Sequence, residues 1–185
     1  AQAQGMALTM GVWLDRRRDH NAREVAAAVD ATHNHRRAVQ RIIAGNETQL
    51  HGSLPPDELH AVLARLRGAT RVPVSTAEPW HVWLARPDLA NHVDFITVHL
   101  LPYWEGVPVE AAVDDALMRY RQVQDRFPGK LVVIGEIGWP SGGPSVGVAH
   151  ATPDRQAAFV RAFLARAADL KLDYHLMEAV DQPWK

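Results

Sequence analysis

Short apolar runs alternate with longer segments that mix alanine with charged residues along this 185-residue chain. The apolar runs predict strands at 7–14, 41–45, 72–76, 95–100, 131–135 and 174–178. The segments between them predict helices at 22–41, 55–67, 109–127 and 152–170, with short helical pieces at 79–84 and 87–91. Runs rich in Ile and Val are typical of strands that are buried on both faces. The pattern therefore predicts an α/β fold in which helices cover a parallel sheet.

Two of the apolar runs end abruptly at a glutamate. The segment IIAGNE (42–47) ends at Glu47, and the segment VVIGEIGWPS (132–141) contains Glu136. Packing gives no reason for an acid at these places, because burying an unpaired carboxylate is costly. Active sites are assembled where parallel strands open onto loops. Two carboxylates at such strand ends are what the hydrolysis of a glycosidic bond requires.

These two motifs, in this order, resemble those of glycoside hydrolase family 17. Its members are β-1,3-glucanases and glucan transglycosylases built on a (β/α)8 barrel. The segment GNE (45–47) resembles the acid/base motif of that family, and EIGWPS (136–141) resembles its nucleophile motif. The segments HLLPYWE (99–105) and MEAVDQPWK (177–185) suggest the bacterial branch. The resemblance extends from about residue 7 to the last residue.

Six predicted strands are fewer than a closed (β/α)8 barrel needs, and such a barrel typically has about 250 residues. Since GNE (45–47) resembles the fourth-strand motif, the chain aligns from the third strand onward. We therefore expect a partial TIM-barrel fold that contains the third to eighth strands and lacks the first two βα units. Residues 1–185 are expected to form a single, incomplete glycoside hydrolase catalytic domain.

The resemblance implies a role for each glutamate. Glu136 is expected to be the nucleophile and Glu47 the general acid/base of a retaining mechanism, with their carboxyl groups about 5–5.5 Å apart. In plant members, a tyrosine of an Asn-x-Tyr-Pro motif lies near the nucleophile, and Leu101 takes its place here. His99 or Tyr103 is expected to supply the missing hydrogen bond.

Other residues near strand ends are expected to contact the substrate. The resemblance implies that Asn46 donates a hydrogen bond to the sugar 2-hydroxyl, and that Glu178 and Lys185 contact substrate or adjust the charge of the site. Glu78 is expected to bind a sugar hydroxyl, and His99 and Tyr103 are also candidate contacts. Indole faces complement the apolar faces of glucose rings. Candidate stacking platforms, each of which is as often a core residue, are Trp80, Trp104, Trp139 and Trp184.

Composition excludes several classes of partner and cofactor. A net charge of −1 lacks the excess of positive charge that is typical of proteins that bind nucleic acid or an anionic membrane. No apolar run approaches the roughly 18 residues of a membrane helix, and the first residues lack the pattern of a secretory signal. The absence of cysteine excludes disulfides and thiolate metal sites. We expect no metal and no cofactor, because the histidines, among them His33, His35, His51 and His60, lack metal-type spacing and are expected on the surface or in structural roles.

Three functional hypotheses follow. The leading one is a retaining β-1,3-glucan hydrolase or transglycosylase, whose partner is a glucan oligosaccharide or polysaccharide. A second is another retaining β-glycosidase of the same clan with a different linkage preference, and a third is a non-catalytic glucan-binding module. The bacterial branch implies a cell-envelope, periplasmic or secreted location and fusion to a membrane-bound glycosyltransferase, without membrane contact by this segment.

Overall fold

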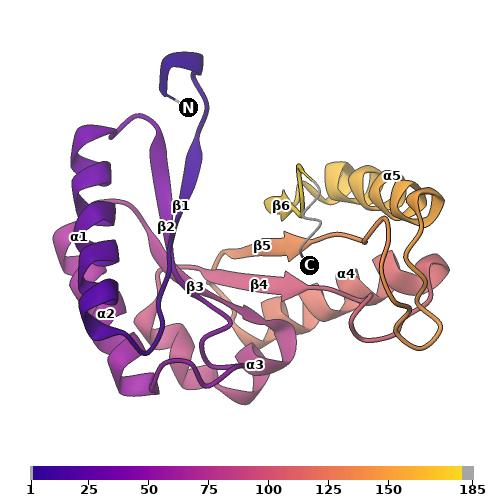
Figure 1. Cartoon of the computed structure of the whole chain (residues 1–185), viewed down its shortest axis with the longest axis horizontal. Helices are drawn as coiled ribbons and strands as arrows, with labels where there is room; N and C mark the ends of the chain where they lie inside the picture. Colours follow the sequence, from indigo (N-terminus) through magenta and orange to yellow (C-terminus); the bar gives the residue numbers. More distant parts are fainter. Residues whose placement is uncertain (1, 181–185) are drawn as a thin grey trace. The chain divides into compact units, whose positions relative to one another are not determined.

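The computed structural model describes residues 2–180 of the chain (Figure 1). Its strands form a six-stranded sheet whose neighbours follow the order of the chain, β1-β2-β3-β4-β5-β6. The pairs β1–β2, β2–β3 and β5–β6 are parallel. The strands are β1 (Leu8–Val12), β2 (Val39–Asn46), β3 (Val74–Pro79), β4 (Ile96–Leu100), β5 (Val132–Ile137) and β6 (Tyr174–Leu176). The helices are η1 (Gln2–Gln4), α1 (Arg18–Asn34), α2 (Pro56–Ala69), α3 (Trp80–Ala85), η2 (Pro87–His92), α4 (Val109–Arg126) and α5 (Pro153–Leu170).

The chain divides into two compact units. Among the described residues, the first unit contains residues 2–97 and Gly129–Leu131, and the second contains Val98–Pro128 and residues 132–180. Strand β4 is shared, since its first two residues belong to the first unit and its last three to the second. In both units the repeat is a strand followed by a helix, as a (β/α)8 architecture requires.

The core of the first unit lies between its strands and the helices α1 and α2. Figure 1 shows α1 and α2 side by side; the two helices contact each other, α1 contacts β1 and β2, and α2 contacts β2 and β3. Helix α2 buries one face completely, at Leu59, Leu63 and Leu66, which recur at the spacing of a helical stripe. Ile42 pairs with Val74 in the sheet, and neither side chain is exposed. Each such burial contributes about 1.5–3 kcal/mol to stability.

A cluster of aromatic side chains forms part of the core of the second unit. Helix α5 presents Phe159 and Phe163, whose rings are stacked with centroids 6.4 Å apart. Tyr174 of β6 contacts Phe163 edge to face at 5.0 Å. Helix α5 begins as the sequence predicts, because the Thr152 side chain accepts a hydrogen bond from the Arg155 amide.

All six predicted strands are present, but one predicted helix is too long. The segment 22–41 was expected to be helical throughout, whereas α1 ends at Asn34 and β2 begins at Val39. Neither a glycine nor a proline marks the helix end between these residues, so the sequence carries only the weaker stop signal of Asn34 beside basic residues. Pairing of Val39 with Leu8 of β1 draws this segment into the sheet instead.

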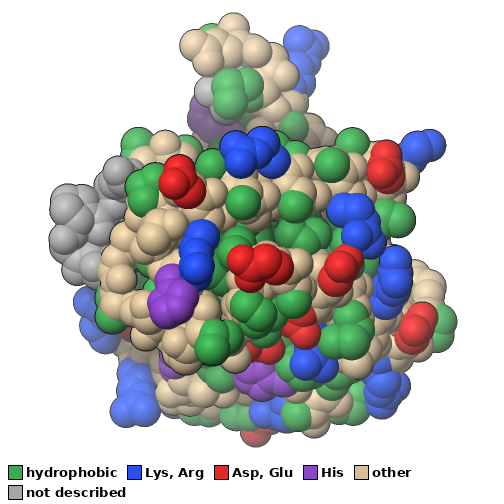
Figure 2. Space-filling view, turned by 90° about the vertical axis from the view of Figure 1, so that its right-hand side faces the viewer, with side chains coloured by type: hydrophobic (Ala, Val, Ile, Leu, Met, Phe, Trp, Pro, Cys, Tyr) green, Lys and Arg blue, Asp and Glu red, His purple; other side chains and the backbone are tan. Residues whose placement is uncertain are grey.

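The described surface has mixed character. Figure 2 shows acidic and basic side chains interspersed with hydrophobic ones on one face, without a continuous region of a single charge. Leu8, on β1 at the end of the strand order, is 43% exposed. Within residues 2–180, no helix is long and apolar enough to cross a bilayer.

Candidate active site

Glu47 lies directly after β2 in an unusual backbone conformation. Its φ angle is +52°, in the left-handed region that residues other than glycine rarely adopt. Such a conformation costs on the order of 1–3 kcal/mol and is often found at functional sites. Its amide donates to the Ala77 carbonyl at 2.8 Å, and its side chain is 17% exposed. The backbone thus holds a partly exposed carboxyl group at the carboxyl end of a strand.

A glycine and a histidine shape the surroundings of Glu47. Gly45 has a φ of +84°, and a Cβ atom there would lie 2.9 Å from Cγ2 of Thr48. This position therefore requires glycine. Nε2 of His51 lies 3.2 Å from Oε2 of Glu47. We expected His51 to be a surface or structural histidine and missed this contact, although a spacing of four residues within one turn brings two side chains together.

The surroundings of Glu78 do not fit the expectation that it binds a sugar hydroxyl. It is the fifth residue of β3 and is completely buried. Its carboxylate accepts hydrogen bonds from the amides of Gln49 and Leu50 and from the hydroxyl of Thr48. Burial raises the pKa of Glu78, and these hydrogen bonds oppose that effect. A carboxylate occupied in this way is directed at the turn after Glu47 and not at solvent.

The two remaining candidates of the first unit are accessible. Asn46 is the last residue of β2 and is exposed, so its amide is available to a ligand. Trp80 opens α3 and is partly exposed, with its ring edge to face against His81 at 5.5 Å. Their contacts with substrate remain predictions.

Glu136 lies on β5 beside a buried histidine of β4. Nδ1 of His99 is 3.8 Å from Oε2 of Glu136, and the side chains are 2% and 28% exposed. Tyr103, the alternative partner, is also buried, but its hydroxyl donates to the Pro144 carbonyl. Of the two residues proposed to replace the plant tyrosine, His99 is therefore the one with a described contact to Glu136.

Tyr103 and Trp139 are core residues, which corrects their assignment as substrate contacts. Trp139 is 2% exposed and lies edge to face against Tyr103, with ring centroids 5.2 Å apart. The other side of Trp139 faces Phe159 at 5.7 Å. These aromatic contacts, together with a hydrogen bond from the indole to the His150 carbonyl, leave no open face for a sugar. Large aromatic side chains contribute most when buried, so packing prevails at both positions.

Of the remaining candidates, two lie among the described residues and are exposed. Trp104 is 64% exposed and stands on the loop after β4, where its ring meets Tyr103 edge to face. This position suits a stacking platform. Glu178 is exposed beyond the end of β6. Trp184 and Lys185 lie outside the described residues, so the structure does not test their predicted roles.

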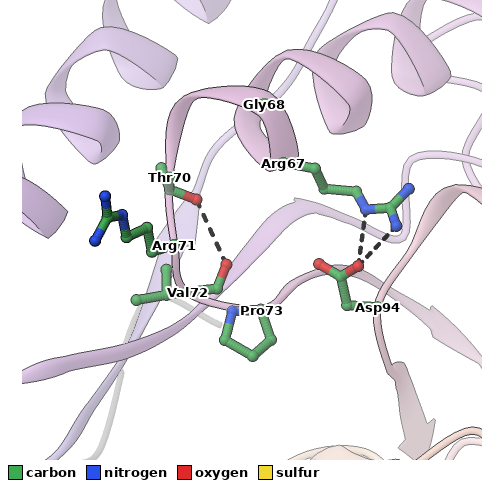
Figure 3. Close-up of a pocket in the computed structure, with 7 residues that line it drawn as sticks. All are labelled: Arg67, Gly68, Thr70, Arg71, Val72, Pro73 and Asp94. Atoms are coloured by element: carbon green, nitrogen blue, oxygen red, sulfur yellow. Dashed lines mark hydrogen bonds and ion pairs between the residues drawn. The ribbon is translucent and has the colours of Figure 1, made fainter.

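A hollow of about 510 Å³ in the first unit lies away from Glu47. Its lining comes from the end of α2, the segment before β3, and Asp94, at the opposite end of the strands from Glu47 (Figure 3). Arg67 points at Asp94, with an ion pair of 2.8 Å, while Arg71 points away from it. This hollow is not part of the candidate site. Among the described residues, no group of three or more potential metal ligands converges.

Comparison with known proteins agrees with the motif resemblance. Residues 1–185 match the BtgE/BtgC glycoside hydrolase domain. A glucan 1,3-beta-glucosidase of Schizosaccharomyces pombe is 31% identical over 161 residues, which cover 80% of this chain and 50% of that protein. The cell surface mannoprotein MP65 of Candida albicans is 29% identical over 129 residues, which cover 66% of this chain and 34% of that protein. The chain therefore spans half, or less, of the length of these relatives.

Solved structures confirm the fold class. The glycoside hydrolase family 17 β-1,3-glucanosyltransferase of Rhizomucor miehei is 28% identical with a TM-score of 0.90, over 99% of this chain and 69% of that one. An active-site mutant of the R. miehei β-1,3-glucanosyltransferase in complex with laminaritriose is 27% identical with a TM-score of 0.89. The expected partial α/β fold of TIM-barrel type is thus confirmed. These relatives are fungal, and they give no support to the expected bacterial branch.

Proposed function

Because the chain belongs to the BtgE/BtgC glycoside hydrolase family, we propose that it acts on β-1,3-glucan, either by hydrolysis or by transfer to a second glucan chain. One observation carries this proposal. Glu47 and Glu136, the two residues on which the motif resemblance rests, are both partly exposed carboxyl groups, each within 4 Å of a histidine nitrogen. Acids kept only for packing would be buried and fully hydrogen-bonded, as Glu78 is.

The proposed mechanism has two steps and retains the anomeric configuration. Glu136 attacks the anomeric carbon while Glu47 protonates the departing glycosidic oxygen, so that the carbon–oxygen bond breaks and a covalent glycosyl-enzyme forms. Glu47 then removes a proton from water or from the hydroxyl of an acceptor sugar. The attack of that oxygen releases the Glu136 carboxylate. Water as acceptor gives hydrolysis, and a sugar hydroxyl gives transfer.

The glucan specificity is supported by the relatives. The S. pombe protein is named a glucan 1,3-beta-glucosidase, and the R. miehei transferase mutant holds laminaritriose. We propose that the exposed Trp104 stacks on a glucose ring and that Asn46 binds the 2-hydroxyl of the reacting sugar. Trp80, Glu178 and Lys185 complete the proposed set of substrate contacts.

We also propose a location at the cell surface or outside the cell. One relative is named a cell surface mannoprotein, which supports that placement. Fusion to a membrane-bound glycosyltransferase remains a prediction of the sequence.

The test is to incubate the complete protein with laminari-oligosaccharides and to follow the products by proton NMR. Retention predicts that the β-anomer of the new reducing end appears first, and products longer than the substrate would indicate transfer. Matched β-1,4-linked gluco- and manno-oligosaccharides serve as controls for the alternative linkage preference. First appearance of the α-anomer would contradict the mechanism, and binding without turnover would favour a glucan-binding module.

A further inference from the structure

The segment after Glu47 forms a single helical turn whose amides need partners. The amide of His51 donates to the carbonyl of Glu47 at 3.0 Å, which closes the turn. The first amides of a helical turn point away from it and find no acceptor within it. Here these are the amides of residues 48–50, immediately after the strained Glu47.

A carboxylate from the neighbouring strand accepts from this turn. Oε1 of Glu78 receives the Gln49 amide at 2.7 Å, and Oε2 receives the Leu50 amide at 3.2 Å. The Thr48 hydroxyl donates to Oε1 at 3.3 Å. Glu78 therefore caps the turn as an N-cap side chain would, but from a different strand. A buried carboxylate is tolerated at this position because these donors stabilise its charge.

We propose that Glu78 is a positioning residue for Glu47, and this rests on the acid/base role proposed above for Glu47. Strand β3 holds Glu47 from two directions: Ala77 accepts its amide, and Glu78 fixes the turn that follows it. Together these contacts oppose the strain of a φ of +52°. Without the cap, the backbone of Glu47 would relax toward ordinary geometry and carry its carboxyl group away from the leaving oxygen.

The side chain of Gln49 braces the same turn. Its Nε2 donates to the Leu54 carbonyl at 3.1 Å, and its Oε1 accepts from Nη1 of Arg86 at 3.2 Å. These contacts hold the far side of the turn, so loss of the Glu78 cap should shift its start near Glu47 more than its end. The expected consequence is a misplaced acid and not a collapsed loop.

The test compares Glu78→Gln, Thr48→Val and Ser75→Ala with the wild type in the complete protein. An amide at position 78 keeps one acceptor oxygen but turns an NH2 group toward the donors of the turn. Thr48→Val removes one donor with little change of shape, and it tests the role independently if Glu78→Gln does not fold. Ser75→Ala is the matched control, since Ser75 is buried on the same strand and donates to the Phe95 carbonyl at 2.7 Å, away from the turn.

Turnover is measured on a laminari-oligosaccharide and on an aryl β-glucoside with an activated leaving group. Glu78→Gln should lower kcat on the oligosaccharide by on the order of 10²-fold, the effect of misplacing a catalytic group by about 1 Å. Its effect on the first step with the activated substrate, measured as kcat/KM for aryl release, should be several-fold smaller, because that leaving group does not require a proton. Thr48→Val should show the same substrate dependence to a lesser degree. Ser75→Ala should lower the melting temperature without changing the ratio of the two rates.

Equal losses on both substrates for Glu78→Gln and Thr48→Val, or a rate ratio like that of Ser75→Ala, would overturn the positioning role alone. A wild-type protein with no turnover on either substrate would overturn the proposed function and this role with it. Hydrogen exchange gives a readout independent of activity. The amides of Gln49 and Leu50 should exchange faster in Glu78→Gln than in the wild type, and unchanged exchange would also overturn the role.

Discussion

His99 and Glu136 lie on neighbouring strands of the second unit, with Nδ1 of the histidine 3.8 Å from Oε2 of the glutamate. The histidine is almost completely buried, whereas the carboxyl group reaches solvent. A buried ring held by strand β4 is well placed to fix the orientation of a nucleophile on β5. We propose that His99 supplies the contact to Glu136 that the tyrosine is expected to make in plant members, where Leu101 stands here.

His99→Phe should therefore lower kcat on laminari-oligosaccharides by on the order of 10²-fold, the cost of a misplaced reacting group. Phenylalanine fills a similar volume, so the fold should be kept, and near-UV circular dichroism checks this. Tyr103→Phe is the comparison, because its hydroxyl donates to Pro144 and not to Glu136. If Tyr103→Phe lowered kcat more than His99→Phe, the assignment of the nucleophile's partner would be reversed.

Truncation of Trp139 should change the stability of the protein much more than truncation of Trp104. Trp139→Ala removes a buried ring and should lower the free energy of unfolding by about 3–5 kcal/mol. Trp104→Ala changes an exposed side chain and should alter it by about 0.5 kcal/mol or less. Urea denaturation of the two variants measures both effects. A destabilisation by Trp104→Ala equal to that of Trp139→Ala would show that Trp104 is a packing residue.

Gly138 is the glycine whose replacement should cost most in the second unit. A Cβ atom there would overlap the Met177 carbonyl oxygen, so the backbone immediately after β6 would have to move. Gly138→Ala should lower the free energy of unfolding by about 1–3 kcal/mol or more. Gly142→Ala, in the same loop region with no heavy atom within 4 Å of the new Cβ, is the control and should change it little. Similar denaturation midpoints for the two variants would contradict the close approach of Gly138 to Met177.

Acid should destabilise the first unit through the stacked rings of His60 and His92, whose centroids are 3.7 Å apart. Burial, followed by the neighbouring His92, lowers the pKa of His60, while Asp57 and Asp88 oppose this and Arg86 adds to it. The folded state therefore binds fewer protons than the unfolded state just below the ordinary histidine pKa of about 6.5. By linkage, stability falls as pH falls from about 6.5 toward the lowered value.

Melting temperatures measured between about pH 7.5 and pH 5 test this dependence. His60→Phe keeps an aromatic ring against His92 and removes the titrating group, so its melting temperature should vary less with pH. His33→Phe, at an exposed histidine of α1, is the control and should follow the wild type. An equally steep dependence in His60→Phe would assign the effect to other groups.

The fold was largely predictable because hydrophobic runs and βα alternation are strong local signals. Composition alone is enough to recognise two of the buried strands, Val132–Ile137 and Ile96–Leu100. The end of α1 was not recognisable, because pairing with β1, a non-local interaction, decides where β2 begins. A sequence without a glycine or proline at that boundary gives only a weak local sign of it.

The sequence predicts two catalytic glutamates, but it says less about the residues that surround them. Motifs identify Glu47 and Glu136, but burial decides the role of each neighbour, and burial is a property of packing. Trp139 and Tyr103 pack against each other, which no spacing in the sequence reveals. Glu78 lies on the predicted strand, but its hydrogen bonds reach the turn after another strand, which no local pattern in the sequence reveals.

The central claim is that Glu136 is the nucleophile and Glu47 the acid/base, and kinetics of Glu136→Ala and Glu47→Ala in the complete protein test it most directly. The nucleophile is needed for every substrate, whereas the acid is needed only when the leaving oxygen requires a proton. On an activated aryl β-glucoside, Glu136→Ala should therefore lose all measurable turnover, while Glu47→Ala should still release the aryl group. On laminari-oligosaccharides both variants should be inactive. Equal losses for the two variants on the activated substrate, or release by Glu136→Ala alone, would contradict the account.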